Sequence, residues 1–334
     1  MENSVEFSLL LGAAGLGAFV LVGLNTTRRG EALAADIARA DCQIVLVQAS
    51  TRHLLDELPL DGVRVIDVDG PEWDALIGGH GCIADFGDVA PDDLMMLIFT
   101  SGTTGDPKAV RCTQRTFAVS GQMLAERFDI GADDVVYLSM PMFHSNAVIA
   151  GWSVALAGGA DVAVRQRFSA SGFLPDVRRY GVTFANYVGK PLHYILCTPE
   201  APDDSTTPDA DNTLRIMYGN EATASDRMRF ATRFGCRVVD GFGSTEGGVA
   251  ITRTPDTPAD ALGPLRAPTA VVDPDSGLPV AVGEVGEIVN SAGPGLFSGY
   301  YRDEKATADR MRGGIYHTGD LAWVDDAGYL HFAG

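Results

Sequence analysis

The chain has 334 residues, 46% of them hydrophobic and 21% charged, which is typical of a soluble globular protein with a large core. Its formal net charge of −19 argues against nucleic acid and anionic membrane surfaces as partners, because both require basic patches. The five cysteines are scattered without a C-x-x-C pair, so neither a zinc site nor a disulfide framework is indicated.

The first predicted elements lie in an apolar run of 16 residues, 9–24, which is near the lower limit for a membrane span. Glu2 and Glu6 stand where a signal peptide would carry basic residues, and no small-residue cleavage site follows. Glycines interrupt the run repeatedly. We therefore expect a buried helix over residues 7–16, a buried strand over residues 19–23, and no transmembrane segment.

Helical and strand patterns then alternate as far as residue 240. The predicted helices cover residues 31–40, 113–128, 169–180 and 226–234. The predicted strands cover residues 44–48, 63–68, 94–100, 134–139, 160–165, 184–188, 214–218 and 237–240. This alternation indicates an α/β fold with mainly parallel sheets covered by helices.

Two stretches depart from the alternation. Residues 199–212 are rich in Pro, Asp, Ser and Thr and predict an exposed, mobile loop. After Glu246 the chain is rich in Pro, Gly and short β segments such as 284–289, which indicates a small distorted β-barrel. We therefore expect α/β subdomains over residues 1–250 and a β-barrel-like subdomain over residues 251–334.

The predicted strand 94–100 runs into a loop of hydroxyls and glycines that closes on Lys108. Glycines let backbone N–H groups gather around an anion, and the hydroxyls and the ammonium add donors. The spacing is not that of a Walker A loop. The loop therefore predicts a phosphate site, with a plain surface turn as the alternative. Its residues are Thr100, Ser101, Gly102, Thr103, Thr104, Gly105 and Lys108.

Three further motifs follow the phosphate loop. They read Tyr218-Gly219-Asn220-Glu221-Ala222, Asp240-Gly241-Phe242-Gly243-Ser244-Thr245-Glu246-Gly247 and Tyr316-His317-Thr318-Gly319-Asp320-Leu321. Phe242, flanked by glycines, can stack on an adenine ring, although a core phenylalanine is the alternative. Glu246 offers Mg²⁺ a hard oxygen ligand, unless it is an ordinary surface acid. Asp320 can accept hydrogen bonds from both ribose hydroxyls, unless it is only a turn residue.

In this order the four motifs resemble those of the adenylate-forming superfamily, which includes acyl-CoA synthetases, nonribosomal peptide adenylation domains and firefly-type luciferases. The resemblance covers essentially the whole chain and is strongest to long-chain and very-long-chain fatty-acid–CoA ligases. It implies the large N-terminal core of such enzymes. The family's mobile C-terminal domain, which carries a catalytic lysine, is expected to be missing, so adenylation by this chain alone is expected to be impaired.

The resemblance also assigns roles. Lys108, Thr245 and Glu246 would be catalytic, with Glu246 also the metal ligand and Thr245 donating to the reacting oxygens. The phosphate loop would hold the β- and γ-phosphates of ATP, and Asp320 would bind the ribose. The remaining nucleotide-binding positions are Gly219, Asn220, Glu221, Ala222, Asp240, Phe242 and Gly243. The family usually has tyrosine at position 242, and phenylalanine keeps the stacking face.

His144 lies in an aromatic–histidine segment that resembles the family's acyl-binding mouth, as either a gate or an ordinary loop histidine. No Asp or Glu occurs between residues 140 and 151. Because an unpaired buried ammonium is costly, an amino acid is a poor substrate and a simple carboxylic acid is favoured.

The implied reaction has two steps. A fatty carboxylate attacks the α-phosphate of MgATP to give acyl-AMP and pyrophosphate, and the thiol of coenzyme A then takes the acyl group. The expected partners are thus a fatty acid, ATP, Mg²⁺ and coenzyme A, in a cytoplasmic protein that is either free or peripheral to a membrane. Two alternatives remain open: a fatty-acyl-AMP ligase that loads a carrier protein, and a non-catalytic nucleotide-binding remnant.

Overall fold

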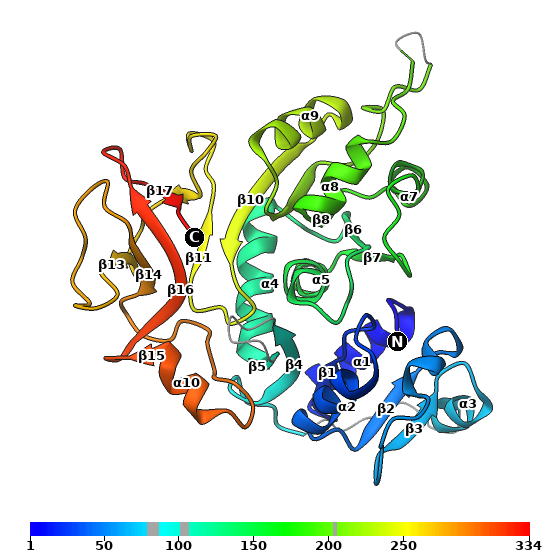
Figure 1. Ribbon diagram of the computed structural model, residues 1–334. Helices are drawn as coiled ribbons and strands as arrows, with labels where there is room; N and C mark the ends of the chain where they lie inside the picture. Colours follow the sequence, from blue (N-terminus) through cyan, green and yellow to red (C-terminus); the bar gives the residue numbers. More distant parts are fainter. Residues whose placement is uncertain (79–86, 101–106, 203–205) are drawn as a thin grey trace.

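A computed structural model of the protein describes residues 1–78, 87–100, 107–202 and 206–334 (Figure 1). It has the α/β fold that the alternation predicted, with one large sheet, two small sheets and a curved antiparallel sheet at the C-terminal end. The N-terminal elements and the C-terminal sheet lie on different sides of the large sheet and the long helix α4.

The N-terminal elements form two small sheets with their covering helices. They are α1 (Val5–Gly15), β1 (Leu21–Gly23), α2 (Gly30–Arg39), β2 (Ile44–Val47), a 3₁₀ helix (Ala49–Leu55), β3 (Arg64–Asp67), α3 (Pro71–Gly78), β4 (Leu94–Thr100) and β5 (Lys108–Thr113). β1 pairs in parallel with β4, β4 pairs antiparallel with β5, and β2 pairs in parallel with β3.

The first helix and strand are confirmed, but the expectation that they are fully buried was wrong. Phe7 and Leu11 of α1 are buried, whereas Leu9 is 68% exposed. Before β1, Phe19 and Val20 are 41% and 42% exposed. One face of α1 packs on β1 and β4, and Ser8 accepts a hydrogen bond from Trp152 at 2.9 Å, whereas Leu9 faces away from these contacts and is exposed. None of the described helices has the length and apolar character needed to cross a membrane.

The large sheet has the strand order β11-β10-β9-β8-β6-β7, and every pair except β10–β11 is parallel. Its strands are β6 (Val135–Leu138), β7 (Asp161–Val164), β8 (Phe184–Val188), β9 (Ile216–Asn220), β10 (Arg237–Gly243) and β11 (Ala250–Thr252). The helices are α4 (Gln114–Phe128), α5 (Ser145–Ala147), a π-helix (Val148–Trp152), α6 (Ser153–Gly158), α7 (Phe173–Tyr180), α8 (Gly189–Leu196) and α9 (Ala224–Phe234).

The long helix α4 forms because the sequence supplies an N-terminal cap and one apolar face. Thr113 caps its first turn by accepting a hydrogen bond from the Thr116 N–H, which satisfies a backbone donor that has no partner within the helix. Phe117, Leu124 and Phe128 are buried on one face, as their spacing predicted. The helix therefore packs on the large sheet through Phe128, which contacts Phe184 and Tyr218, and lies beside the helical segment 145–158, which also contacts the sheet.

The polar segment 199–212 is held more firmly than its composition predicted. Residues 203–205 lie outside the described part. In the remainder, Asp209 is buried and its carboxylate pairs with Arg233 at 2.6 Å. Arg178 donates to the Pro208 carbonyl at 2.8 Å. Cations from neighbouring helices thus replace the apolar side chains that the segment lacks.

The C-terminal part is the curved antiparallel sheet, with order β12-β17-β16-β14-β13 and β15 paired to β16. Its elements are β12 (Gly263–Pro264), β13 (Thr269–Val272), β14 (Gly286–Asn290), α10 (Glu304–Arg310), β15 (Met311–Arg312), β16 (Ile315–Val324) and β17 (Tyr329–Phe332). The change from parallel to antiparallel pairing agrees with the barrel-like character expected after residue 246.

Candidate active site

Two of the predicted motifs lie at the same edge of the large sheet. β9 and β10 are parallel neighbours, so the residues at their carboxyl ends, Asn220 and Gly243, end on one side of the sheet. Gly219 lies so close to β8 that a Cβ atom on it would be 2.1 Å from the Tyr187 carbonyl oxygen. Glu221 then turns the chain with a φ of 65°. The first of these motifs therefore turns at the sheet edge, where Glu221 is exposed and Gly219 and Ala222 are buried.

Asp240 is a partly buried member of this edge whose two carboxylate oxygens both accept hydrogen bonds. Tyr187 donates its hydroxyl to Oδ1, and Arg227 donates to Oδ2 at 2.7 Å. Burial raises the pKa of the Asp240 carboxyl, while the tyrosine and arginine donors work in the opposite direction. Asp240 therefore ties β8 and α9 to the strand that carries Phe242.

Phe242 is partly buried at the end of β10. Its ring lies 6.3 Å from the ring of Phe332 in β17, with an interplanar angle of 45°. Phe332 is exposed and was not predicted from the sequence, because it lies 90 residues from Phe242 and belongs to no motif. The two aromatic rings stand at the junction of the large sheet and the curved sheet.

Thr245 lies next to the segment that contains His144. The Thr245 hydroxyl is 2.8 Å from the hydroxyl of Ser145, the first residue of α5. The His144 ring packs 4.5 Å from the ring of Phe143. Burial lowers the pKa of His144, so its imidazole is neutral at neutral pH. The structure thus brings the predicted acyl-mouth histidine and the predicted reacting-centre threonine together, with Ser145 as a contact that sequence reasoning missed.

Glu246 is buried, with 7% of its surface exposed. The hydroxyl of Tyr300 donates to its Oε1 at 2.9 Å. The described residues contain no group of three or more His, Cys, Asp or Glu side chains placed to hold a metal ion. One carboxylate nevertheless fits Mg²⁺, which usually takes one or two protein carboxylates and completes its shell with phosphates and waters.

Asp320 lies in β16 with its carboxylate free of hydrogen bonds from the rest of the described chain. Burial raises the pKa of this carboxyl, and the nearby Arg310 opposes the shift. The backbone on either side is fixed: Gly319 donates to the buried Glu287 at 2.9 Å, and Asp320 N–H donates to the Thr318 hydroxyl at 3.0 Å. Asp320 is thus held by its main chain while its two oxygens remain open to a ligand.

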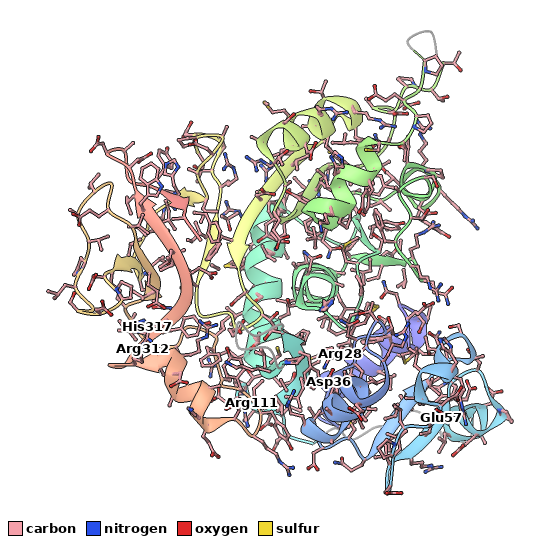
Figure 2. All side chains as sticks on the ribbon, viewed as in Figure 1. Arg28, Asp36, Glu57, Arg111, Arg312 and His317 are labelled. Atoms are coloured by element: carbon pink, nitrogen blue, oxygen red, sulfur yellow. The ribbon has the colours of Figure 1, made fainter. Side chains whose placement is uncertain are left out.

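Glu287, which accepts the hydrogen bond from Gly319 through Oε1, has further partners at its other carboxylate oxygen. Its Oε2 lies 2.8 Å from Nδ1 of His317 and 3.0 Å from Arg312. These two partners are labelled in Figure 2. A register shift between Glu287 and Val289 accompanies the pairing of β14 with β16. The buried Glu287 and His317 and the exposed Arg312 thus form a charged cluster at the turn before Asp320.

Five residues of the predicted phosphate loop lie outside the described residues: Ser101, Gly102, Thr103, Thr104 and Gly105. The two ends of the loop are described. Thr100 ends β4 and is the register partner of Lys108, which begins β5. The Lys108 ammonium lies 5.2 Å from the centroid of the Tyr300 ring. The loop therefore joins two paired strands, and its lysine begins the second of them, which the sequence reasoning did not predict.

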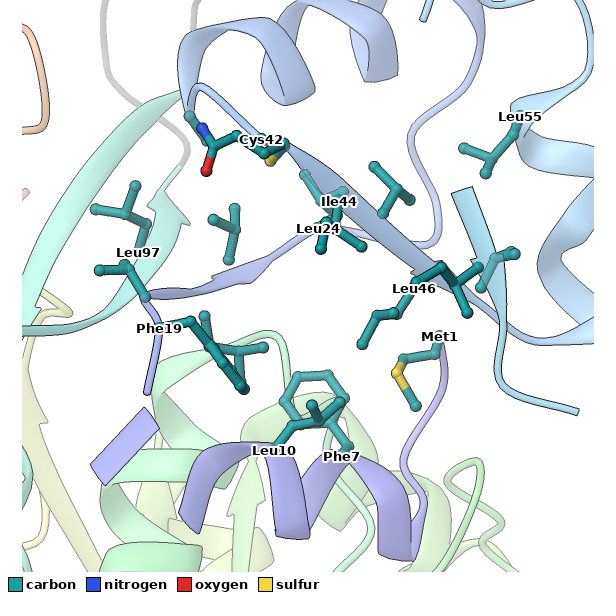
Figure 3. Close-up of a pocket in the computed structure, with 18 of the residues that line it drawn as sticks. Met1, Phe7, Leu10, Phe19, Leu24, Cys42, Ile44, Leu46, Leu55 and Leu97 are labelled. Atoms are coloured by element: carbon teal, nitrogen blue, oxygen red, sulfur yellow. The ribbon is translucent and has the colours of Figure 1, made fainter. Parts of the chain in front are cut away.

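Two apolar pockets lie elsewhere in the described part of the chain. A pocket of about 580 Å³ is lined by α1, β1, β2 and neighbouring residues, including Phe7, Phe19 and Leu46 (Figure 3). None of the predicted site residues lines it. A second pocket, of about 790 Å³, lies between α4 and α6 and includes Trp152 and Leu156.

Comparisons with known proteins agree with the motifs. The family described as AMP-binding enzyme matches residues 1–301. The medium/long-chain-fatty-acid–CoA ligase FadD17 of Mycobacterium tuberculosis is 58% identical and that of Mycobacterium marinum 56%, in both cases over the whole of this chain and 65% of the relative. The steroid-22-oyl-CoA synthetase of Rhodococcus jostii is 42% identical over the whole chain and 62% of its own length. The chain therefore spans about two thirds of these relatives or slightly less.

Solved structures share the fold. ATP-bound MatB from Rhodopseudomonas palustris has a TM-score of 0.85 and 26% identity, covering all of this chain and 67% of that protein. The o-succinylbenzoate CoA synthetase from Bacillus subtilis, solved with an acyl-adenylate intermediate, has a TM-score of 0.81 at 23% identity and covers 99% of this chain and 84% of that one.

Proposed function

Because the chain belongs to the AMP-binding enzyme family, we propose that it is the core of a fatty-acid–CoA ligase that forms an acyl-AMP from a medium- or long-chain carboxylate and passes the acyl group to coenzyme A. The observation that carries the proposal is the convergence of Phe242, Thr245, Glu246 and Asp320 at one junction between two sheets. The similarity to ligases named for medium- and long-chain fatty acids supports the substrate class.

The proposed adenosine site uses the groups at this junction. Phe242 offers a ring face for the adenine, backed by the segment 219–222. Asp320 accepts hydrogen bonds from the ribose hydroxyls, because its carboxylate has no hydrogen-bond donor among the described residues while its main chain is held by Thr318. These contacts orient the α-phosphate toward Thr245.

The proposed chemistry is mainly positioning and charge neutralisation. The fatty carboxylate oxygen attacks the α-phosphorus, and the bond to the pyrophosphate oxygen breaks. Thr245 donates to the reacting oxygens, and Lys108 lies beside the leaving phosphates. Bound Mg²⁺, held by Glu246, would neutralise phosphate charge. In the second step the thiolate sulfur of coenzyme A attacks the acyl carbonyl and AMP leaves.

The acid is proposed to be uncharged apart from its carboxylate. The segment 143–147 contributes a neutral His144, the uncharged polar side chains of Ser145 and Asn146, and two apolar side chains, and it offers no carboxylate to an ammonium group. An amino-acid substrate would leave that ammonium unpaired. A fatty acid leaves no such charge.

The substrate class can be tested on this chain with acyl-sulfamoyl-adenosines, stable analogues of the acyl-adenylate. We expect dodecanoyl and hexadecanoyl analogues to bind more tightly than an aminoacyl analogue and more tightly than one carrying a bulky steroid acid. Isothermal calorimetry measures the ranking. Tighter binding of the aminoacyl analogue would contradict a fatty substrate, and tighter binding of the steroid analogue would redirect the proposal to polycyclic acids.

A further inference from the structure

Tyr300 occupies an unusual place, where the C-terminal part of the chain pairs with β5. Arg111 donates its N–H to the Gly299 carbonyl at 3.0 Å, and Tyr301 donates to the Ala109 carbonyl at 2.8 Å. Tyr300 itself forms an antiparallel bridge to the same strand. The backbone of Tyr300 is therefore fixed to the strand that begins with Lys108, although no motif of the sequence contains it.

The side chain of Tyr300 contacts three charged groups at once. Its ring faces the Lys108 ammonium at 5.2 Å. Its hydroxyl donates to Glu246 Oε1 at 2.9 Å and accepts from Arg310 Nε at 3.3 Å. Burial, reinforced by the charge of Glu246, raises the pKa of Tyr300 to about 12. The phenol therefore stays protonated at neutral pH and remains a donor to the carboxylate.

Arg310 extends the contact to the other side of the site. Besides the tyrosine hydroxyl, it donates to the carbonyl of His317 at 3.2 Å and to the carbonyl of Thr318. These carbonyls immediately precede the turn that carries Asp320. A continuous series of contacts thus runs from Lys108 through Tyr300 and Arg310 to the turn that carries Asp320. Glu246 joins this series through its hydrogen bond from Tyr300.

We infer that Tyr300 is a positioning residue. It fixes the positions of Lys108 and Glu246 relative to each other and, through Arg310, relative to Asp320. The inference rests on the proposed function, because it assumes that these three groups hold the triphosphate, the metal and the ribose. The ring keeps the ammonium near the phosphates by cation–π attraction. The hydroxyl fixes one carboxylate oxygen of Glu246 and leaves the other for the metal.

The test compares Tyr300→Phe and Tyr300→Leu with the control Tyr301→Phe. Tyr301 is the adjacent tyrosine, whose ring faces Arg302 and none of the proposed site residues. ATP binding is measured by calorimetry over a series of Mg²⁺ concentrations, AMP binding without metal is measured in parallel, and thermal unfolding reports folding. For Tyr300→Phe we expect the half-saturating Mg²⁺ concentration to rise about tenfold, the usual effect of losing a hydrogen bond to a charged group.

AMP binding should be nearly unchanged in Tyr300→Phe, because the ring still supports Lys108 and Arg310 still reaches the Thr318 carbonyl. Tyr300→Leu should lose a further few-fold in ATP affinity, because it removes the ring under the ammonium. Arg310→Lys should instead weaken AMP binding, since one ammonium cannot reach the hydroxyl and both carbonyls. The control should match the wild type throughout.

Each failure is distinct. If the wild-type chain binds ATP and Tyr300→Phe keeps the wild-type Mg²⁺ dependence, the inference is wrong and the proposed function stands. If Tyr300→Phe does not fold, folded Arg310→Lys provides the test. An AMP affinity equal to that of the wild type overturns the proposed link from Tyr300 through Arg310 to Asp320, and a weaker AMP affinity supports that link. A folded wild-type chain that binds neither ATP nor AMP overturns the proposed function and the inference together.

Discussion

At the scale of single residues, the candidate site contains three carboxylates in different settings. Asp240 is surrounded by donors from Tyr187 and Arg227, and Glu246 has one oxygen bound by Tyr300. Asp320 alone among these three has no hydrogen bond to its carboxylate within the described residues. The open carboxylate is therefore the best placed to accept from a ribose.

The raised pKa of Asp320 predicts a pH dependence of nucleotide binding. Ribose hydroxyls donate to the ionised carboxylate, so AMP affinity should fall as the pH drops through a midpoint above 3.8, the ordinary value for an aspartate. Calorimetric titration with AMP from about pH 8 down to about pH 4.5 measures this dependence around the reference range for carboxyl groups.

Asp320→Asn serves as the matched variant for that titration. It should bind AMP weakly with little pH dependence over the same range. It should also be more stable than the wild type at neutral pH, because burial of the ionised carboxylate opposes folding above its raised pKa. A wild-type affinity that stays constant across the range would contradict the assignment of Asp320 to the ribose.

The sequence indicated candidate site residues more readily than it indicated the contacts that surround them. Phe242, Thr245 and Asp320 belong to local motifs with recognisable residue types, so they could be found by reading along the chain. Tyr300, Ser145 and Phe332 make their contacts across 54, 100 and 90 residues. No local pattern indicates such contacts, because they arise only when separate sheets pack together.

At the scale of elements, the close approach of β8 and β9 determines the position of residues 219–222, the segment proposed to lie beside the adenine. Gly219 is the register partner of Tyr187 in β8 and of Asp240 in β10. The space above it is occupied by the Tyr187 main chain, so the position cannot take a side chain without moving a strand. The same pairing explains why β9 ends later than the sequence predicted. The strand continues to Asn220, two residues past its predicted end, because it stays paired with β8.

Gly219→Ala should therefore destabilise the chain by about 1–3 kcal/mol, as overpacking does, and should abolish nucleotide binding. Gly243→Ala is the matched control for stability alone, because a Cβ there would lie 3.4 Å from the nearest atom, the Val249 carbonyl oxygen, whereas Gly243 is itself a predicted nucleotide-binding position. Chemical denaturation measures the difference. Equal stabilities of the two variants would show that β8 and β9 are not as closely packed as described.

At the scale of the whole molecule, the candidate site belongs to no single sheet. Lys108 comes from the β4–β5 hairpin, Phe242 from the large sheet and Asp320 from the curved sheet. The alternation of patterns predicted the parallel sheets and the change to antiparallel structure after residue 246. It could not predict how the sheets dock, because docking depends on pairings such as that of Tyr300 with β5.

A site built across three sheets makes ligand binding a property of the whole fold. A ligand that binds only the folded chain should raise its unfolding free energy by about 2.7 kcal/mol at a concentration one hundred times its dissociation constant. The strong net negative charge of the molecule does not prevent binding of an anionic nucleotide, because local donors act at much shorter range than the overall field.

The most direct test of the central claim is calorimetric titration of this chain with a fatty-acyl-sulfamoyl-adenosine, alongside Phe242→Ala, Asp320→Ala and the control Asp326→Ala. Asp326 is an exposed acid of the same sheet, in the turn between β16 and β17, outside the site. We predict tight binding to the wild type and the control, and binding at least tenfold weaker in the other two variants, the effect expected for a lost hydrogen bond to a charged group or a lost aromatic contact. Wild-type affinity in the Phe242 and Asp320 variants, or no binding by the folded wild-type chain, would contradict an adenylate site at this junction.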